Sequence, residues 1–146
     1  MCAELKRDRV LSLLQNERIV SELKFTKEHE WIKINDEGEV AIIGISDFAQ
    51  EQLGDIVSIE LPKAGGVFRQ GQTIAIVDSV KASSDIYAPI SGEIIEVNEE
   101  LTERPEIINQ SPYDSGWIAK IKPSNMEEFE NLMAKEKYDR YIGEIK

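Results

Sequence analysis

One lysine stands where a side chain could be modified by another enzyme. Lys81 lies in a short polar stretch between two apolar runs, within "VDSVKASSDIYAPISGEI". This pattern predicts the tip of a β-hairpin, where the lysine projects and the strands hold it in place. A lysine amine is a target for acylation, and Val80 and Ala82 leave the approach open, while Asp78 and Asp85 could guide a modifying enzyme. Lys81 is therefore either a solvated turn residue, as many lysines are, or an attachment point.

The chain offers few other groups for chemistry. It contains one cysteine, Cys2, one histidine, His29, and no glycine-rich phosphate loop. A single cysteine forms no intramolecular disulfide, and nothing indicates an oxidising compartment. No second His or Cys stands at ligand spacing from His29, so we expect a structural or partly exposed histidine and no metal site. The usual residues of an independent active site are nearly absent, and we expect no catalytic residues.

Composition and charge narrow the classes of function. The 146 residues carry 17 basic and 28 acidic side chains, a formal net charge of −11. Non-specific nucleic-acid binding and anionic-membrane binding both need clustered positive charge, so we expect neither partner. The acidity favours partners with basic patches, or serves only to keep the protein in solution. No apolar run approaches the roughly 20 residues that span a bilayer.

Short strands are expected to position Lys81. Six segments rich in Ile and Val, bounded by Gly, Pro, Asn or Asp, predict strands. "NDEG" at 35–38 predicts a hairpin connection between the first two. Residues 46–54 read as a short helix, with Ser46 or Asp47 as the cap and Gly54 as the end. The six expected strands span residues 31–35, 39–46, 55–62, 73–79, 92–98 and 117–123.

An approximate repeat predicts how these strands are arranged. "GDIVSIEL" begins at Gly54 and "GEIIEVNE" begins at Gly92, each with a glycine, an acid, Ile and a further aliphatic residue. Two similar half-sheets joined by a hairpin predict a flattened, two-sheet β-sandwich. Lys81 lies between the two copies, on the expected connecting turn.

The two ends of the chain predict helices. Residues 1–20 form an extension in which Val10, Leu13 and Leu14 share one face of a possible amphipathic helix. Its acidic residues are unlike a mitochondrial transit peptide, and it has no signal-peptide apolar core, so we expect a cytoplasmic location. After residue 123, Ser124 and Glu127 stand at capping-box spacing before one or two helices. The apolar faces expected there are Phe129, Leu132 and Met133, then Tyr138, Tyr141 and Ile142.

The segment "SVKASSDIYAPISGEIIEVN" resembles the lipoyl-attachment segment of the glycine cleavage system H-protein family. The resemblance continues through "KFTKEHEWI", "VAIIGISDFAQEQLGDIVSIELP" and "NQSPYDSGWIAKIKP" into the C-terminal helical region. It covers about residue 22 to the C-terminus, so we expect an H-protein-type domain over 21–146. The resemblance implies a mainly β fold, the barrel-sandwich hybrid of lipoyl and biotinyl carriers, with a short internal helix and C-terminal helices.

The same resemblance implies roles for particular residues. Lys81 corresponds to the family's lipoyl lysine, and Asp78, Val80 and Ala82 lie at its attachment-site recognition positions. Two positions depart from the pattern. Asp78 stands where the family usually has Glu, and Gln52 stands where some members have a histidine in the pocket for the loaded arm. The positions near that arm are Glu30, Ser84 and Asp85, which could also serve only as strand-edge and hairpin caps.

By resemblance, the chain is a non-catalytic carrier in the glycine cleavage cycle. Lipoate on Lys81 would receive the aminomethyl group from glycine decarboxylase (P-protein) and pass its carbon on at the aminomethyltransferase (T-protein). Dihydrolipoyl dehydrogenase (L-protein) would restore the disulfide, and a lipoyl-attaching enzyme would load Lys81.

Other readings remain open from the residues. A lipoyl or octanoyl relay protein would carry the same Lys81 segment, and an unmodified structural β-sandwich is a third reading. Biotin carriers typically set their lysine between two methionines, which Val80 and Ala82 do not match. Lipoyl domains of 2-oxoacid dehydrogenases usually read "DKA" here and lack the HEW segment and the C-terminal helices.

Overall fold

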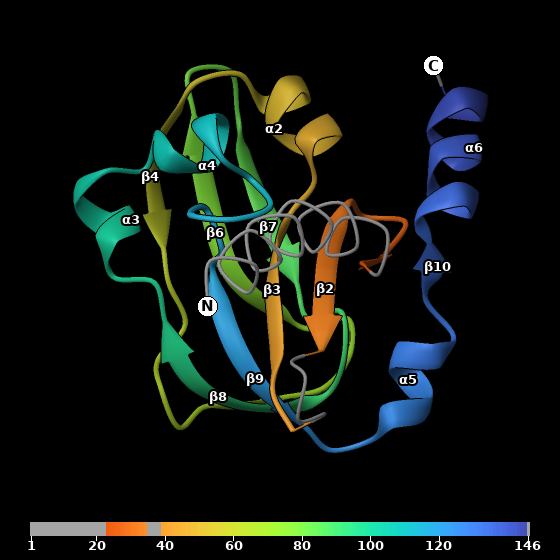
Figure 1. The fold of residues 1–146 in the computed structure, drawn as a ribbon. Coiled ribbons are helices and arrows are strands. Elements are labelled where there is room, and N and C mark those ends of the chain that lie inside the picture. Colours follow the sequence, from red (N-terminus) through yellow and green to blue (C-terminus); the bar gives the residue numbers. More distant parts are fainter. Residues whose placement is uncertain (1–22, 35–38, 146) are drawn as a thin grey trace, which may run out of the picture.

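The computed structural model describes residues 23–34 and 39–145, which form two antiparallel sheets with short helices around them (Figure 1). The larger sheet has the strand order β10-β1-β2-β3-β9-β8-β5, and the smaller has the order β4-β6-β7. The strands of the two sheets are β1 (Lys24–Phe25), β2 (Glu30–Ile34), β3 (Ala41–Ile45), β4 (Ile56–Glu60), β5 (Val67–Phe68), β6 (Thr73–Ser79), β7 (Ser83–Tyr87), β8 (Gly92–Val97), β9 (Ala119–Pro123) and β10 (Met133–Ala134). The helices of the described residues are α2 (Asp47–Leu53), α3 (Glu100–Glu103), α4 (Ile107–Gln110), α5 (Met126–Glu130) and α6 (Lys135–Ile145).

The six predicted strands are all present within the described residues. The strand expected at 73–79 has those bounds as β6, the one expected at 31–35 is shifted by one residue as β2, and the other four are shorter than expected by one to three residues. Strand β7 was not among the six, because it lies in the polar stretch that follows Lys81. The two-residue strands β1, β5 and β10 were not predicted either, because two residues are too few to show an alternating pattern. The expected turn at 35–38 and the expected helix in 1–20 lie outside the described residues.

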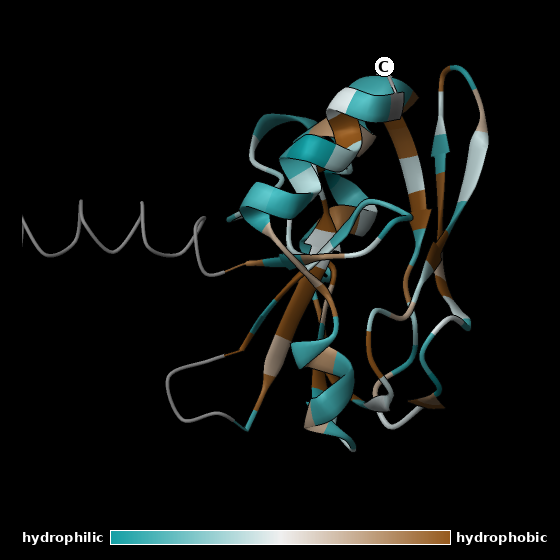
Figure 2. Ribbon diagram, turned by 90° about the vertical axis from the view of Figure 1, so that its right-hand side faces the viewer, coloured by the Kyte–Doolittle hydropathy of each residue, from teal (hydrophilic) through white to brown (hydrophobic). Residues whose placement is uncertain are grey.

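The two copies of the repeat belong to different sheets. The first copy forms β4 in the smaller sheet, and the second forms β8 in the larger one. This confirms the prediction of a two-sheet arrangement. A core of buried Ile, Val, Ala and Leu side chains draws on both sheets, with Ile59 and Val77 from the smaller sheet and Ile43 and Ile121 from the larger. Figure 2 shows the apolar residues concentrated on the strands, whereas α6 presents mainly hydrophilic residues on its visible side.

Helix α2 begins and ends as predicted. The Ser46 hydroxyl accepts a hydrogen bond from the Ala49 N–H, which satisfies one of the free donors at the helix start. At the other end, Gly54 has φ 77° and ψ −155°, a conformation that glycine adopts without the steric penalty of a side chain.

The C-terminal prediction was wrong in two details. The cap of α5 is Asn125 rather than Ser124, because its side chain accepts from the Glu127 N–H at 3.0 Å. Met133 does not continue a helical face with Phe129, since it lies in β10 and pairs with Phe25 of β1. Helix α6 follows β10 along this side of the molecule (Figure 1). Its Tyr138 stacks on Phe25 of β1 with ring centroids 4.3 Å apart. Among the described residues, no helix has the length and apolarity needed to cross a membrane.

Candidate functional site

Lys81 lies in the turn that joins β6 to β7, at the tip of a hairpin, and its side chain is exposed. The Ser79 N–H donates to the Ala82 carbonyl at 2.8 Å, which closes the turn. The Ser79 hydroxyl accepts from the Lys81 and Ala82 N–H groups at 3.2 and 3.1 Å and donates to the Ala82 carbonyl at 3.0 Å. The turn is therefore ordered by its own backbone and by one serine, while the lysine side chain is left accessible.

The residues expected around the attachment point lie as neighbours of this turn. Val80 is 64% exposed, and Ala82 is exposed as well. Asp78 is the penultimate residue of β6, and its carboxylate accepts a hydrogen bond from the Ser58 hydroxyl of β4 at 3.1 Å. An acid and a small apolar surface therefore flank an accessible amine, as an enzyme that recognises this lysine would require.

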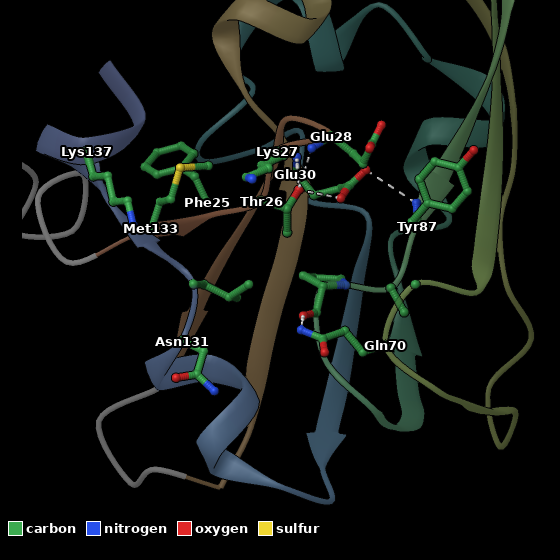
Figure 3. A pocket seen from close by; sticks show the side chains of 14 residues that line it. Phe25, Thr26, Lys27, Glu28, Glu30, Gln70, Tyr87, Asn131, Met133 and Lys137 are labelled. Atoms are coloured by element: carbon green, nitrogen blue, oxygen red, sulfur yellow. Dashed lines mark hydrogen bonds between the residues drawn. The ribbon is translucent and has the colours of Figure 1, made fainter. Parts of the chain in front are cut away.

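A cavity of about 270 Å³ opens between the end of β7, the β1–β2 corner and the C-terminal segment (Figure 3). Apolar walls come from Phe25, Leu132 and Met133, and charged groups from Glu28, Lys27 and Lys137 stand around them. Figure 3 shows Met133 and Lys137 on the side opposite Tyr87, with Glu30 between. The full lining is Phe25, Thr26, Lys27, Glu28, Glu30, Gln70, Gly71, Tyr87, Ala88, Pro89, Asn131, Leu132, Met133 and Lys137.

Glu30 is the buried acid of this cavity, with a residue exposure of 2%. Its carboxylate accepts the Thr26 hydroxyl at 2.6 Å and the Tyr87 N–H at 3.3 Å, and so links β2 of one sheet to β7 of the other (Figure 3). Burial raises the pKa of Glu30 to about 7, because the ionised form loses hydration. The hydrogen bonds from Thr26 and Tyr87 act in the opposite direction and favour the ionised form.

His29, next to this acid, has a structural setting. Its Nδ1 lies 2.8 Å from the Tyr138 hydroxyl, which in turn lies 2.7 Å from the Ser46 hydroxyl. Burial lowers the pKa of the histidine, with a smaller opposing effect from Glu28. We expected a histidine that is structural or partly exposed, and His29 is half-buried with its ring nitrogen bonded to Tyr138. Within residues 23–34 and 39–145, no group of three or more His, Cys, Asp or Glu side chains is placed to hold a metal ion.

Trp31 completes the HEW segment by anchoring it to a distant loop. Its indole N–H donates to the Pro112 carbonyl at 2.8 Å, and the residue is 1% exposed. Gly44 lies opposite on β3, where an added Cβ would come within 2.7 Å of the indole ring. The HEW segment on β2 therefore packs against β3 and is hydrogen-bonded to the loop at Pro112. Glu30 is the one side chain of this segment that lines the cavity.

The structure separates the residues expected near the arm into two positions. Glu30 lines the cavity, whereas Ser84 and Asp85 lie on β7 between the cavity and Lys81 and are not part of its lining. Side chains alternate along a strand, so Asp85 shares a face with Tyr87, and Ser84 shares the other face with the buried Ile86. Gln52 is exposed on α2.

Several residues that shape this region were missed by the sequence analysis. Ser79 could have been found, since a serine two residues before a turn lysine is a typical turn-stabilising pattern. Thr26, Tyr87 and Asn109 gave no comparable signal. Thr26 bonds to Glu30 four residues further along the chain, whereas the partners of Tyr87 and Asn109 are brought near only by the fold: Glu30 and Tyr87 are 57 positions apart, and Gly54 and Asn109 are 55 apart.

Comparisons with known proteins agree with this geometry. A family model described as "Glycine cleavage H-protein" matches residues 23–145. The glycine cleavage system H protein of Halothermothrix orenii is 50% identical over 123 residues, which are 84% of this chain and 94% of that protein. The protein of the same name from Carboxydothermus hydrogenoformans is 48% identical over 126 residues, 86% of this chain and 95% of that one.

A solved structure gives the same result for the fold. The crystal structure of a glycine cleavage system H protein from Mycobacterium marinum matches with a TM-score of 0.77 and 32% identity, covering 84% of this chain and 98% of that one. The predicted barrel-sandwich hybrid with short helices is thereby confirmed. Because the family model matches residues 23–145 and a relative over 84% of the chain is 50% identical, the chain belongs to the glycine cleavage H-protein family.

Proposed function

We propose that this chain performs the carrier role of its family through lipoate bound covalently to Lys81. The family makes the chain a lipoyl carrier of the glycine cleavage system. The observation that supports Lys81 is its place in the hairpin turn, exposed and flanked by the exposed Val80 and Ala82. The amine can enter an enzyme's active site while β6 and β7 keep their pairing, so attachment requires no local unfolding.

The residues beyond the turn fit a long arm with an apolar chain and a polar end. From Lys81, the outer face of β7 passes Asp85 and reaches Tyr87 at the cavity. Phe25, Leu132 and Met133 would contact apolar parts of the arm and exclude water. When bound, lipoate supplies a disulfide that acts as electrophile and redox couple, which needs no catalytic side chain beside it.

Glu30 and Asp85 are the acids that could hold an ammonium group on the carried fragment. Glu30 is the better placed, because it lines the cavity and is almost fully buried. Ionised Glu30 would pair with a cation in surroundings of low dielectric, where such a pair is stronger than in water. Asp85 is exposed on the way to the cavity, so its contribution would be weaker.

The carrier in this proposal shuttles the aminomethyl group from glycine decarboxylase to the aminomethyltransferase, and dihydrolipoyl dehydrogenase reoxidises the arm. The chemistry belongs to the cofactor and these enzymes, so the chain itself is no catalyst. Tethering raises the effective concentration of the carried group at each partner. Recognition by the lipoyl-attaching enzyme is assigned to Asp78, Val80 and Ala82, and the expected cytoplasmic location is part of the same proposal.

The decisive experiment replaces the attachment residue. We expect Lys81→Arg to keep the fold, since an exposed turn substitution changes stability by less than about 0.5 kcal/mol, and to abolish both lipoylation and glycine-dependent turnover. The matched control is Lys63→Arg, another exposed loop lysine. Intact mass after incubation with the attaching enzyme and turnover with the partner enzymes are the measurements. Lipoylation that persists in Lys81→Arg would contradict the assignment.

A relay function is the second candidate, because the Lys81 turn would serve it equally well. Transfer of the intact acyl group from the loaded protein to a dehydrogenase lipoyl domain would indicate a relay. Loading from glycine, with no such transfer, would indicate the cleavage cycle alone.

A further inference from the structure

The corner between α2 and β4 lies directly beneath the Lys81 side chain. Gly54 ends α2 with φ 77°, and its N–H donates to the Gln50 carbonyl at 2.9 Å. A Cβ placed on Gly54 would lie 3.3 Å from Cε and 3.6 Å from Cδ of Lys81, and 3.6 Å from Cγ2 of Val80. The methylene stem of the lysine therefore lies over the bare Cα of this glycine, although Lys81 is far from Gly54 in the sequence.

Backbone contacts hold the turn against this corner. The Val80 N–H donates to the Asp55 carbonyl at 2.9 Å, immediately after Gly54. Ser79 pairs with Ile56 in the ladder between β4 and β6. The turn is thus fixed to the corner on one side of Lys81, and the lysine stem has a defined surface to lie on.

Asn109 of α4 fixes the corner from another element. Its Nδ2 donates to the Gly54 carbonyl at 2.9 Å and to the Gln50 side-chain oxygen at 3.0 Å. Its Oδ1 accepts from the Ile56 N–H at 3.0 Å. One side chain therefore satisfies backbone groups on both sides of the corner, which leaves the Gly54 backbone little freedom to move.

We propose that Gly54, held by Asn109, is a positioning residue that seats the Lys81 stem and so orients its amine for acylation. This rests on the proposed function, in which Lys81 carries lipoate. The lipoyl group must arrive as an activated acyl donor, a mixed anhydride or thioester, on the attaching enzyme. The deprotonated amine forms an amide with the acyl carbon, the bond to the activating group breaks, that group leaves with its electron pair, and the amine releases a proton.

The surface at Gly54 affects the rate of acylation because it restricts the rotamers of the Lys81 stem, which are many in a free lysine. Ordering such a stem costs up to about 2 kcal/mol, and a seat that already restricts it lowers the cost of reaching the reactive geometry. Glycine meets both demands at this position, because it accepts a backbone with φ 77° and ψ −155° and leaves room for the stem. A Cβ at residue 54 would require the stem to shift by a few tenths of an ångström while the turn keeps its backbone contacts.

The test compares two glycines that share a strained backbone but differ in their neighbours. Gly65 has φ +90°, and an added Cβ there meets nothing within 4 Å. Gly54→Ala and Gly65→Ala both add a Cβ to a backbone of positive φ, and only the Cβ added at Gly54 meets Lys81. Gly54→Asn and Gly65→Asn form a second pair, with a longer side chain at the same two positions.

The readouts separate positioning from stability. We expect kcat/KM of the attaching enzyme to fall roughly tenfold or more for the Gly54 variants and to stay near the parent value for the Gly65 variants. Acetylation of Lys81 by a small activated ester, followed by peptide mass, should be equal in all five proteins, because a small reagent needs no fixed approach. Thermal unfolding of every variant is measured as well, and kcat/KM is compared at a temperature below the lowest unfolding midpoint.

Two results would overturn the inference, and they are distinguishable. A parent protein that takes up no lipoyl group at Lys81 would overturn the proposed function itself. If the parent protein is lipoylated and kcat/KM is equal for the Gly54 and Gly65 variants, the positioning role of Gly54 is wrong and the proposed function stands.

Discussion

Strand β7 joins two regions that are built in opposite ways. At its start, Lys81 is exposed in a turn held by Ser79. At its end, the Tyr87 N–H donates to Glu30, an acid that is 2% exposed. A basic side chain stands at one end and an acidic one at the other, and only the acid is buried.

This comparison shows two ways in which a fold can prepare a side chain for function, by exposing it or by burying it. Water hydrates the amine of Lys81, so what the fold can contribute there is access and direction. For Glu30, the fold removes water and thereby raises the pKa of the carboxyl to about 7. The turn end should therefore respond to changes in geometry and little to pH, whereas the cavity end should respond strongly to pH.

The largest expected effect tests the cavity end. Because the pKa of Glu30 rises from 4.5 to about 7 on folding, the native protein keeps a proton that the unfolded chain releases between these values. The free energy of unfolding contributed by this group is therefore greatest below about pH 4.5 and falls as pH rises to 7, by at most about 3 kcal/mol. We expect Glu30→Gln to remove this part of the pH dependence in denaturant unfolding measured from pH 4 to 8.

The control for this measurement is Glu93→Gln, which removes an exposed acid on β8. It should keep the slope of the parent protein between pH 4.5 and 7. An unchanged slope in Glu30→Gln would mean that the acid at the end of β7 is hydrated like the lysine at its start, and the contrast would be lost.

A smaller effect tests the turn end. Ser79→Ala removes two side-chain acceptor contacts and one donor contact in the turn, so we expect a loss of about 1 kcal/mol of unfolding free energy that does not vary with pH. The variant should also be lipoylated more slowly, because the turn that orients Lys81 is looser. The control is Ser83→Ala at the exposed start of β7. A loss of stability that grows with pH would contradict the division between the two ends.

The smallest stability effect is expected at Asp78, whose role is assigned to recognition. Within the part of the chain that the structure describes, the one hydrogen bond to its carboxylate comes from the Ser58 hydroxyl at 3.1 Å, so Asp78→Ala should change stability by less than about 0.5 kcal/mol. The initial rate of lipoylation should nevertheless fall, and Asp78→Glu should match or exceed the parent rate. Equal rates in all three proteins would leave Asp78 as a strand-end residue only.

Much of the fold and the position of Lys81 in a turn could be predicted because they depend on local rules. Alternation of Ile and Val located the strands, and Ser46 and Gly54 marked the ends of α2. The α5 cap was misplaced by one residue, since Ser124 and Asn125 are adjacent and both are good capping residues. Capping is decided by backbone conformation, which residue types alone do not show.

The amino-acid sequence by itself determined that Lys81 stands on a turn between two strands, because strand period and turn composition act over a few residues. Only the tertiary structure decided which residue the Lys81 side chain contacts and how far the pKa of Glu30 in the cavity is raised. Gly54 reaches Lys81, and Glu30 reaches Tyr87, through the packing of two sheets. Burial and steric contact depend on which surfaces the folded chain brings together. The alternation of residues in a strand does not predict which distant residues will pack against that strand.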